Sequence, residues 1–370
     1  KVGYKPQTAA AIEAGASTGG QIMPPIMGAG AFIMAEITGI PYTELVIAAI
    51  IPAVLYFVSI YFMVDLEAQK LNMKGLPRSE LPNFRELLTR IYLFIPIIML
   101  IGAMFMGYSV IRAGAYATAA AMVVSWLTPA AMGPLAVLKA LALASRMAIQ
   151  IIAVCACAGI IVGVISMTGV GARFSSLLLA IAEQNQLIAL FFAMCIAIVL
   201  GMGMPTTAAY AVAASVVAPG LIQLGIQPLI AHFFVFYFAV ISAITPPVAL
   251  AAYAGAAIAG SEPMKTSVES FKIGLAAFVV PFMFFYSPGL LMEGEWLTIA
   301  RNCVTALVGV FLLSAAVQGF LFGRIGVLLR LATLAAALLM ISGGFITDIA
   351  GIALGVALWV YQTRLAARTA

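Results

Sequence analysis

Two stretches of this chain place a pair of prolines inside an apolar segment, and they decide the fold. The first reads Gly19-Gly-Gln-Ile-Met-Pro24-Pro25-Ile-Met-Gly-Ala-Gly-Ala, and the second reads Ser242-Ala-Ile-Thr-Pro246-Pro247-Val-Ala-Leu-Ala-Ala-Tyr-Ala-Gly. Adjacent prolines remove two backbone donors and clash with the preceding helical turn, so a helix must break there. We therefore predict two broken helices, over residues 8–36 and 227–259.

The composition indicates that these segments lie in lipid. Of 370 residues, 64% are hydrophobic and 8% are charged, whereas a soluble domain carries about 25% charged residues. A helical span needs about 20 apolar residues, so we predict an all-α integral membrane protein with roughly ten spans. Besides the broken helices, the candidate spans are residues 42–64, 91–108, 113–127, 148–168, 271–286, 299–322, 327–341 and 345–361.

A third segment predicts a re-entrant hairpin over residues 187–219. It reads Leu200-Gly-Met-Gly-Met-Pro205-Thr-Thr-Ala-Ala-Tyr210, and each apolar flank is too short to span. An ordinary helix–turn–helix is the alternative. With a cytoplasmic N-terminus, every basic residue except Arg112, Arg173 and Arg301 lies inside, provided that the hairpin enters and leaves from the outer face.

Two shorter features complete the layout along the membrane. Residues 135–146 and 173–185 are amphipathic, and we predict that they lie along the inner and outer surfaces, respectively. The net charge of +5 reflects this loop bias, and no basic stripe with interleaved aromatics indicates a nucleic-acid partner.

Broken helices inside a bilayer have a chemical consequence. Their freed backbone groups survive only where they are buried in protein or line a wet cavity. Carbonyls of an unwound stretch can bind Na⁺, and the amino end of a half-helix can face an anion. A matched pair of breaks therefore indicates a transport site, whereas two kinked helices without a ligand are the alternative.

Two polar groups of the first broken helix need separate interpretation. Glu13 lies within the span, where it could favour cations, carry a proton, or merely pair near the interface. Gly15-Ala-Ser17-Thr-Gly19 matches the Gly-x-Ser-x-Gly pattern of hydrolases, but no strand pattern precedes it, and the single histidine, His232, lies among aromatics. We interpret Ser17 and Thr18 as ligands instead.

Three motifs together carry a resemblance to a known family. Glu13-Ala-Gly-Ala-Ser-Thr-Gly-Gly-Gln-Ile-Met-Pro-Pro, Gly201-Met-Gly-Met-Pro-Thr-Thr-Ala-Ala-Tyr and Ile244-Thr-Pro-Pro-Val-Ala-Leu-Ala-Ala-Tyr resemble the large membrane subunit of tripartite ATP-independent periplasmic (TRAP) transporters. The sequences of these motifs most resemble those of the fused permeases of the TAXI subgroup. The resemblance covers residues 1–290.

The resemblance implies an inverted-repeat, elevator-type secondary transporter in a prokaryotic inner membrane, not an enzyme. A TAXI-type periplasmic binding protein would deliver a small organic anion, commonly a carboxylate, and a Na⁺ or proton gradient would drive its import. No ATP hydrolysis is involved, no phosphate-binding Gly-x-x-x-x-Gly-Lys-[Ser/Thr] loop occurs here, and no cofactor is expected beyond Na⁺.

The resemblance also implies site residues, transferred motif by motif. One Na⁺ would lie at Gly19 and Gly20, with Glu13 as a possible coupling residue. The implied ligands of a second Na⁺ are Met202, Gly203, Met204, Thr207, Ile244 and Thr245. The expected substrate contacts are Ser17, Thr18, Gln21, Thr206, Thr207 and Thr245.

We expect four segments. Residues 1–64 would form the C-terminal part of the first repeat, 65–147 a cytoplasmic loop with scaffold or arm helices, 148–290 the second repeat, and 291–370 extra membrane helices. In the second repeat the hairpin precedes the Pro-Pro break. By analogy, the hairpin of the first repeat should precede Lys1, so we expect it to be missing here. The competing functions are a passive channel or facilitator, an intramembrane hydrolase using Ser17, and a structural scaffold.

Overall fold

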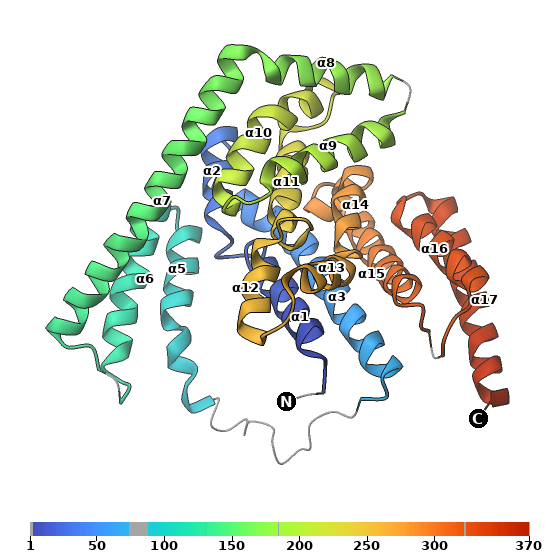
Figure 1. The fold of residues 1–370 in the computed structure, drawn as a ribbon. Coiled ribbons are helices and arrows are strands. Elements are labelled where there is room, and N and C mark those ends of the chain that lie inside the picture. The colour runs from blue at the N-terminus through green and yellow to red at the C-terminus, as the bar shows by residue number, and fades with distance from the viewer. Residues whose placement is uncertain (1–2, 74–87, 130, 184, 322, 370) are drawn as a thin grey trace. The chain divides into compact units, whose positions relative to one another are not determined.

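The computed structural model describes residues 3–73, 88–129, 131–183, 185–321 and 323–369. Over these residues the regular structure is helical (Figure 1), apart from an isolated bridge between Phe320 and Arg324. The predicted all-α class is confirmed. The chain divides into two compact units, residues 3–73 with 158–369, and residues 88–157. Four basic residues used in the topology argument lie outside the described residues: Lys1, Lys74, Arg78 and Arg85.

Both predicted breaks are confirmed, and the two broken helices match in length. The first consists of α1 (Pro6–Gly19) and α2 (Ala29–Thr38), which have 14 and 10 residues. The second consists of α11 (Pro228–Ile241) and α12 (Leu250–Ala259), again with 14 and 10 residues, with the short 3-10 helix η3 (Ser242–Ile244) after α11. Both Pro-Pro peptide bonds are cis. Each second half ends at a left-handed glycine, Gly39 or Gly260.

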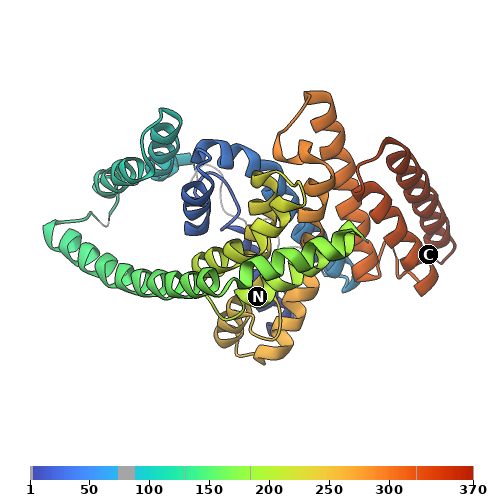
Figure 2. The same cartoon turned by 90° about the horizontal axis from the view of Figure 1, so that it is seen from above.

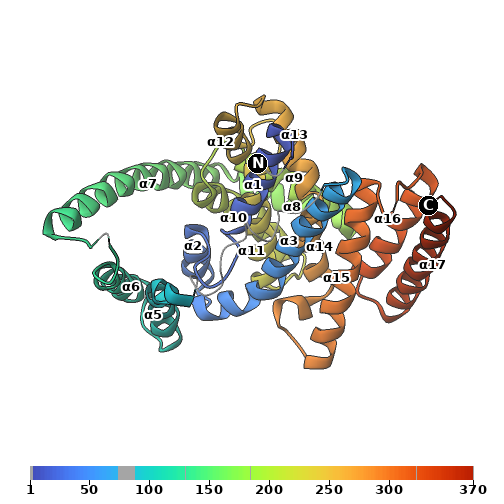
Figure 3. The same cartoon turned by 90° about the horizontal axis from the view of Figure 1, so that it is seen from below.

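The two broken helices run antiparallel to one another. α1 packs against α12, and α2 packs against α11, so that the first half of each meets the second half of the other. Figures 1 and 3 show α1 beside α12. The contacts are close, because a Cβ added at Gly255 of α12 would lie 3.1 Å from the Ala10 carbonyl oxygen of α1. A Cβ at Gly30 of α2 would lie 2.8 Å from the ring of Phe236 in α11.

The segment between residues 187 and 219 forms a helical hairpin. Its second helix, Thr206–Gln223, is long and apolar enough to cross a membrane, so the expectation that each flank is too short to span is wrong for that flank. The hairpin consists of α9 (Gln186–Gly201) and α10 (Thr206–Gln223), joined by a tip over residues 202–205. Asn185 caps α9 by accepting the backbone N–H groups of Leu187 and Ile188. Gly203 adopts φ +74° at the tip, a conformation that favours glycine. Entry and exit of the hairpin on one membrane face stays a prediction.

A long helix links the first broken helix to the C-terminal helices. α3 (Tyr42–Lys70) packs against α15 (Trp296–Gln318), and the Gln318 amide donates to the Met63 carbonyl at 2.9 Å. The 3-10 helix η5 (Pro288–Leu291) precedes α15 and also contacts α3. α15 is followed by α16 (Val327–Ile341) and α17 (Phe345–Thr369), and the three lie side by side (Figures 2 and 3).

The second unit contains a smaller helical hairpin. The 3-10 helix η2 (Ile91–Phe94) leads into α5 (Ile95–Phe105), which packs against α6 (Val110–Ser125). The Ser109 hydroxyl caps α6 by accepting the Arg112 backbone N–H at 3.5 Å. These helices correspond to the predicted spans 91–108 and 113–127.

One predicted surface helix is wrong. Residues 135–146 do not form a separate helix, because α7 (Pro134–Thr168) continues without a break through the predicted span 148–168. No glycine or proline occurs between Pro134 and Gly159, so nothing in the chain stops the helix. The second amphipathic stretch does form its own helix, α8 (Val170–Ala182), which turns by 68° from the preceding helix at Gly169.

The predicted span over residues 271–286 is not one continuous helix. α13 (Pro263–Gly274) ends before the 3-10 helix η4 (Ala277–Val279), and α14 (Val280–Tyr286) follows at an angle of 58°. Pro281 explains the break, because it has no N–H to donate to the Ala277 carbonyl one turn earlier.

Four helices of the described residues are long and apolar enough to cross a membrane: α3, α10, α15 and the Phe345–Gln362 part of α17. Counting two bent helix pairs, Cys155–Thr168 with Val170–Ala182 and Pro263–Gly274 with Ala277–Tyr286, raises the number to six. Each half of the broken helices is too short on its own, as expected where two halves share one span. The total of roughly ten spans stays a prediction.

Candidate functional site

The structure places the hairpin tip against the second break. A Cβ added at Gly201, the last residue of α9, would lie 2.5 Å from the Ser242 hydroxyl oxygen in η3. A Cβ at Gly203 would meet the Val248 side chain at 3.5 Å. The segment holding Met202 to Met204 and the segment holding Ile244 and Thr245 are therefore neighbours, which brings together the residues expected around the second Na⁺.

The polar groups around this contact are partly satisfied already. Thr245 is buried, and its hydroxyl donates to the Ile241 carbonyl at 2.9 Å. The Tyr253 hydroxyl of α12 donates to the Pro247 carbonyl inside the break. Thr206 and Thr207 lie half-buried on the first turn of α10, where the backbone N–H groups have no partner within the helix. The two threonine hydroxyls and the first backbone N–H groups of α10, which have no acceptor within the helix, thus lie at one end of the hairpin.

The first break has a different environment, dominated by α3. Gly19 is buried against Tyr56, whose ring carbons lie 2.3 Å and 2.6 Å from where a Cβ would stand. The Tyr56 hydroxyl donates to the Gly15 carbonyl at 2.8 Å, which fixes the ring. The Gln21 carbonyl accepts the Gly28 N–H at 2.8 Å and closes the unwound segment.

One buried hydroxyl beside the first break has no hydrogen-bond partner among the described residues. It is Oγ1 of Thr18, a residue that is 2% exposed. A buried polar atom without a partner costs about 1–3 kcal/mol, which keeps Thr18 as a candidate for a ligand contact. The Gly19 carbonyl is less free than we expected, since it accepts the N–H groups of Ile22 and Met23.

Glu13 and Ser17 lie outside this buried set. Both are exposed on α1, and the Ser17 hydroxyl donates to a Glu13 carboxylate oxygen at 3.0 Å. His232 makes a 2.8 Å hydrogen bond with the Tyr210 hydroxyl through its Nδ1. In the described part of the chain Ser17 thus pairs with a carboxylate on its own helix and follows no strand, which does not fit a hydrolase nucleophile.

The two breaks are linked through η3. α1 contacts η3, and η3 contacts α9, so the first broken helix reaches the hairpin through the second. The carboxyl ends of α1, α9 and α11 and the amino ends of α2, α10 and α12 all adjoin a break or the tip. Carboxyl ends present carbonyls to cations, and amino ends favour anions. Among the described residues, no cluster of three or more His, Cys, Asp or Glu side chains could hold a metal ion. Backbone carbonyls and hydroxyls would therefore have to bind any cation.

Sequence reasoning missed two kinds of residue. Tyrosines stabilise both breaks, because Tyr42 donates to the carbonyls of Pro25 and Ile26 just as Tyr253 does to that of Pro247. Ser270 of α13 is buried, and its hydroxyl has no partner among the described residues. The helical spacing of Thr266, Ser267 and Ser270 could have predicted a polar face on this helix. The structure shows that all three side chains of this face are fully buried.

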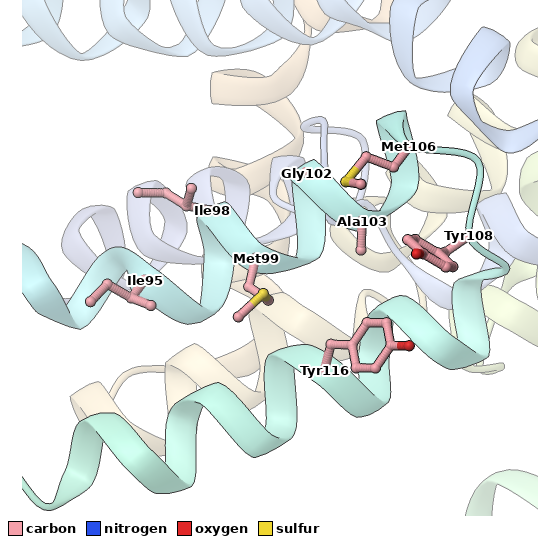
Figure 4. A pocket seen from close by; sticks show the side chains of 8 residues that line it. All are labelled: Ile95, Ile98, Met99, Gly102, Ala103, Met106, Tyr108 and Tyr116. Carbon is pink, nitrogen blue, oxygen red and sulfur yellow. The ribbon is translucent and has the colours of Figure 1, made fainter.

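A pocket in the second unit is not a candidate for this chemistry. It has a volume of about 410 Å³ and lies between α5 and α6 (Figure 4). Its lining is apolar apart from Tyr108 and Tyr116, whose rings meet edge to face at 5.7 Å. Without a charged group or a break in the backbone, this pocket offers no anion or cation site.

Paired broken helices, a helical hairpin with two threonines beside its tip and several apolar spans define a multi-pass membrane transporter. A family model for the tripartite ATP-independent periplasmic transporter, DctM component, matches residues 1–295. The chain belongs to this family, and it is therefore the large permease component of a TRAP transporter. A search among curated proteins finds no match.

Proposed function

We propose that this permease imports a small organic anion, a carboxylate, across a prokaryotic inner membrane by coupling its movement to a Na⁺ gradient. A periplasmic binding protein of the TAXI type hands over the substrate. Membership of the family implies that the chain is a transporter subunit, that it carries a small solute and that it works with a periplasmic binding protein. The coupling ion, the substrate class, the TAXI type and the membrane are our proposal.

The observation that carries the proposal is the antiparallel pairing of two matched broken helices. An inverted repeat related by an in-plane pseudo-twofold axis predicts this pairing of first half with second half. It supports a site shared by the two breaks, with carbonyls turned to Na⁺ and the amino ends of α2, α10 and α12 turned to a carboxylate. Alternating access would then move one part of the permease past another, as in an elevator.

The direct test is uptake into proteoliposomes containing the full-length permease that includes these residues, its companion subunits and its binding protein loaded with labelled carboxylate. We expect uptake under an inward Na⁺ gradient and none when K⁺ replaces Na⁺. Counterflow that is equally fast with and without Na⁺ would instead indicate a passive facilitator, and uptake driven by a proton gradient alone would overturn Na⁺ coupling.

Thr207→Val tests the hairpin tip within the same assay. Valine keeps the shape and removes the hydroxyl, so a ligand role predicts a loss of about 1–3 kcal/mol in apparent Na⁺ or substrate affinity. Thr333→Val is the matched control, since that hydroxyl only donates to the Leu329 carbonyl of its own helix. Unchanged Na⁺ dependence and substrate affinity in Thr207→Val would remove Thr207 from the site.

A further inference from the structure

A second apolar pocket, of about 650 Å³, opens between the hairpin and the C-terminal helices. Its size falls within the range of about 300–1,000 Å³ that is usual for small-molecule sites. α9 and α14 form two walls, and α16 forms the third. The lining residues that the argument uses are Ile188, Phe191, Phe282, Tyr286, Leu338 and Ser342.

One end of this pocket is polar and fixed in place. Ser342 lines the pocket, and the carbonyl of the next residue, Gly343, accepts a hydrogen bond from Nη2 of Arg301 at 3.5 Å. Nε of Arg301 lies 3.8 Å from a carboxylate oxygen of Asp348, which is buried. Among the described residues Nη1 of Arg301 has no partner, and the side chain is 41% exposed. Nη2 also donates to the Asn302 side-chain oxygen at 3.4 Å, so Arg301 is held next to the residue that follows Ser342, without being part of the pocket lining itself.

An exposed tryptophan near this end supports a position close to the lipid headgroups. Trp296, five residues before Arg301 on α15, is 75% exposed, and exposed tryptophans collect at the membrane–water interface. Ile188 and Phe191 lie near the capped start of α9 and are each 56% exposed. The pocket thus combines an exposed apolar wall on α9 with a cation that binds the residue following Ser342.

We propose that this pocket binds a phospholipid, with one acyl chain between α9, α14 and α16 and the phosphate on Arg301. Charge complementarity selects this occupant, because a free guanidinium edge suits a phosphate and the wall below it suits a hydrocarbon chain. Asp348 offsets part of the arginine charge, and the phosphate is the group that Arg301 would contact. The pocket in Figure 4 has no charged lining residue and carries no such inference.

This site gives the C-terminal helices a binding role that does not depend on which ion or solute the permease carries. α16 lies beyond residue 295, where the family match ends. The bound lipid would join α16 to the first helix of the hairpin, so its presence would stabilise the packing of these two elements.

The test compares two lipids with identical acyl chains on the purified, delipidated full chain in detergent. Dioleoylphosphatidylglycerol should raise the midpoint of thermal unfolding, whereas dioleoylglycerol, which lacks the phosphate, should not. Arg301→Gln should need at least tenfold more phospholipid for half of the shift, and Arg301→Lys should retain most of the response. Arg173→Gln, an exposed arginine on α8, is the matched control and should behave as wild type.

Leu338→Trp separates pocket filling from loss of the arginine. It leaves Arg301 intact but fills the cavity, so it should abolish the lipid-dependent shift even if Arg301→Gln fails to fold. A phosphatidylglycerol with a photoreactive acyl chain should label peptides of α9, α14 and α16 in wild type and not in Leu338→Trp. Equal shifts from the two lipids, or wild-type lipid dependence in both variants, would overturn the proposal.

Discussion

The predicted ligand threonines differ in whether their hydroxyls already have a hydrogen-bond partner. Thr18 and Thr245 are both buried, but only Thr245 has an internal acceptor, at the Ile241 carbonyl. Folding therefore leaves the Thr18 hydroxyl dehydrated and unpaired, a cost of about 1–3 kcal/mol that a bound ion would remove. The resemblance implied Thr18 as a substrate contact and Thr245 as both a substrate contact and a Na⁺ ligand, but the sequence could not show which hydroxyl already has a backbone acceptor.

We predict that Thr18→Val affects the stability without Na⁺ and the stabilisation by Na⁺ in different ways. Because the hydroxyl is unpaired, its removal should leave the Na⁺-free protein at least as stable as wild type. The stabilisation that Na⁺ gives to wild type should be reduced in the variant. The measurement is the thermal unfolding midpoint in detergent over a NaCl series, with choline chloride holding ionic strength constant.

Thr333→Val supplies the comparison, since it removes a hydroxyl that is paired within its own helix. It should lose about 1 kcal/mol without Na⁺ and keep the full Na⁺ response. If Thr18→Val is strongly destabilised without Na⁺ and responds to Na⁺ as wild type does, the Thr18 hydroxyl is not an ion ligand.

At the scale of elements, local chemistry decided which predictions succeeded. The breaks at residues 24–25 and 246–247 were predictable because tandem prolines forbid a continuous helix in any environment. The hairpin tip was predictable because Gly203 and Pro205 stop helices. The separate helix over residues 135–146 was wrong because charge alone, here Lys139 and Arg146, does not end a helix.

The tyrosines that support the breaks were not predictable, because they reach the prolines through packing. Tyr42 begins the next helix after the first broken one, and Tyr253 lies in the second half of the second. Both nevertheless donate to carbonyls of the unwound segments. Each break therefore has one phenol that satisfies at least one of its freed carbonyls.

We predict that Tyr42→Phe and Tyr253→Phe each lower the stability of the protein by about 0.5–1.5 kcal/mol, the usual net value of one hydrogen bond. Tyr61→Phe, on the exposed face of α3, should change it by less than about 0.5 kcal/mol. Thermal unfolding in detergent measures all three. Tyr42→Phe and Tyr253→Phe variants that unfold together with Tyr61→Phe would show that the phenols do not support the breaks.

At the scale of the whole chain, the repeat is visible in both spacing and packing. Pro24 follows Pro6, the first residue of α1, by the same 18 residues that separate Pro246 from Pro228. The antiparallel contact between the two broken helices adds what the sequence could not give, namely which halves meet. Pattern alone identifies two similar segments, whereas their relative direction follows only from the packed structure.

The C-terminal helices are tied to the same framework. α15 packs on α3 through the Gln318–Met63 hydrogen bond and a second one from the Lys70 ammonium to the Gln318 carbonyl at 3.3 Å. The sequence offered no motif for this tail, because helix-to-helix docking depends on which faces meet. α3 thus contacts both the first break and the C-terminal helices.

The central claim is that the two broken helices lie antiparallel, and one cross-link tests it. A Cβ at Gly255 would lie 3.6 Å from that of Ala10, within the range of about 3.5–4.5 Å that disulfides require. In a chain whose four cysteines are replaced by alanine, Ala10→Cys with Gly255→Cys should form a disulfide in oxidised membranes, detected by mass spectrometry of the linked peptides. Ala10→Cys with Gly39→Cys, where a Cβ at Gly39 meets no atom within 4 Å, is the control. The account predicts high yield for the first pair only, and a yield no higher than the control would contradict it.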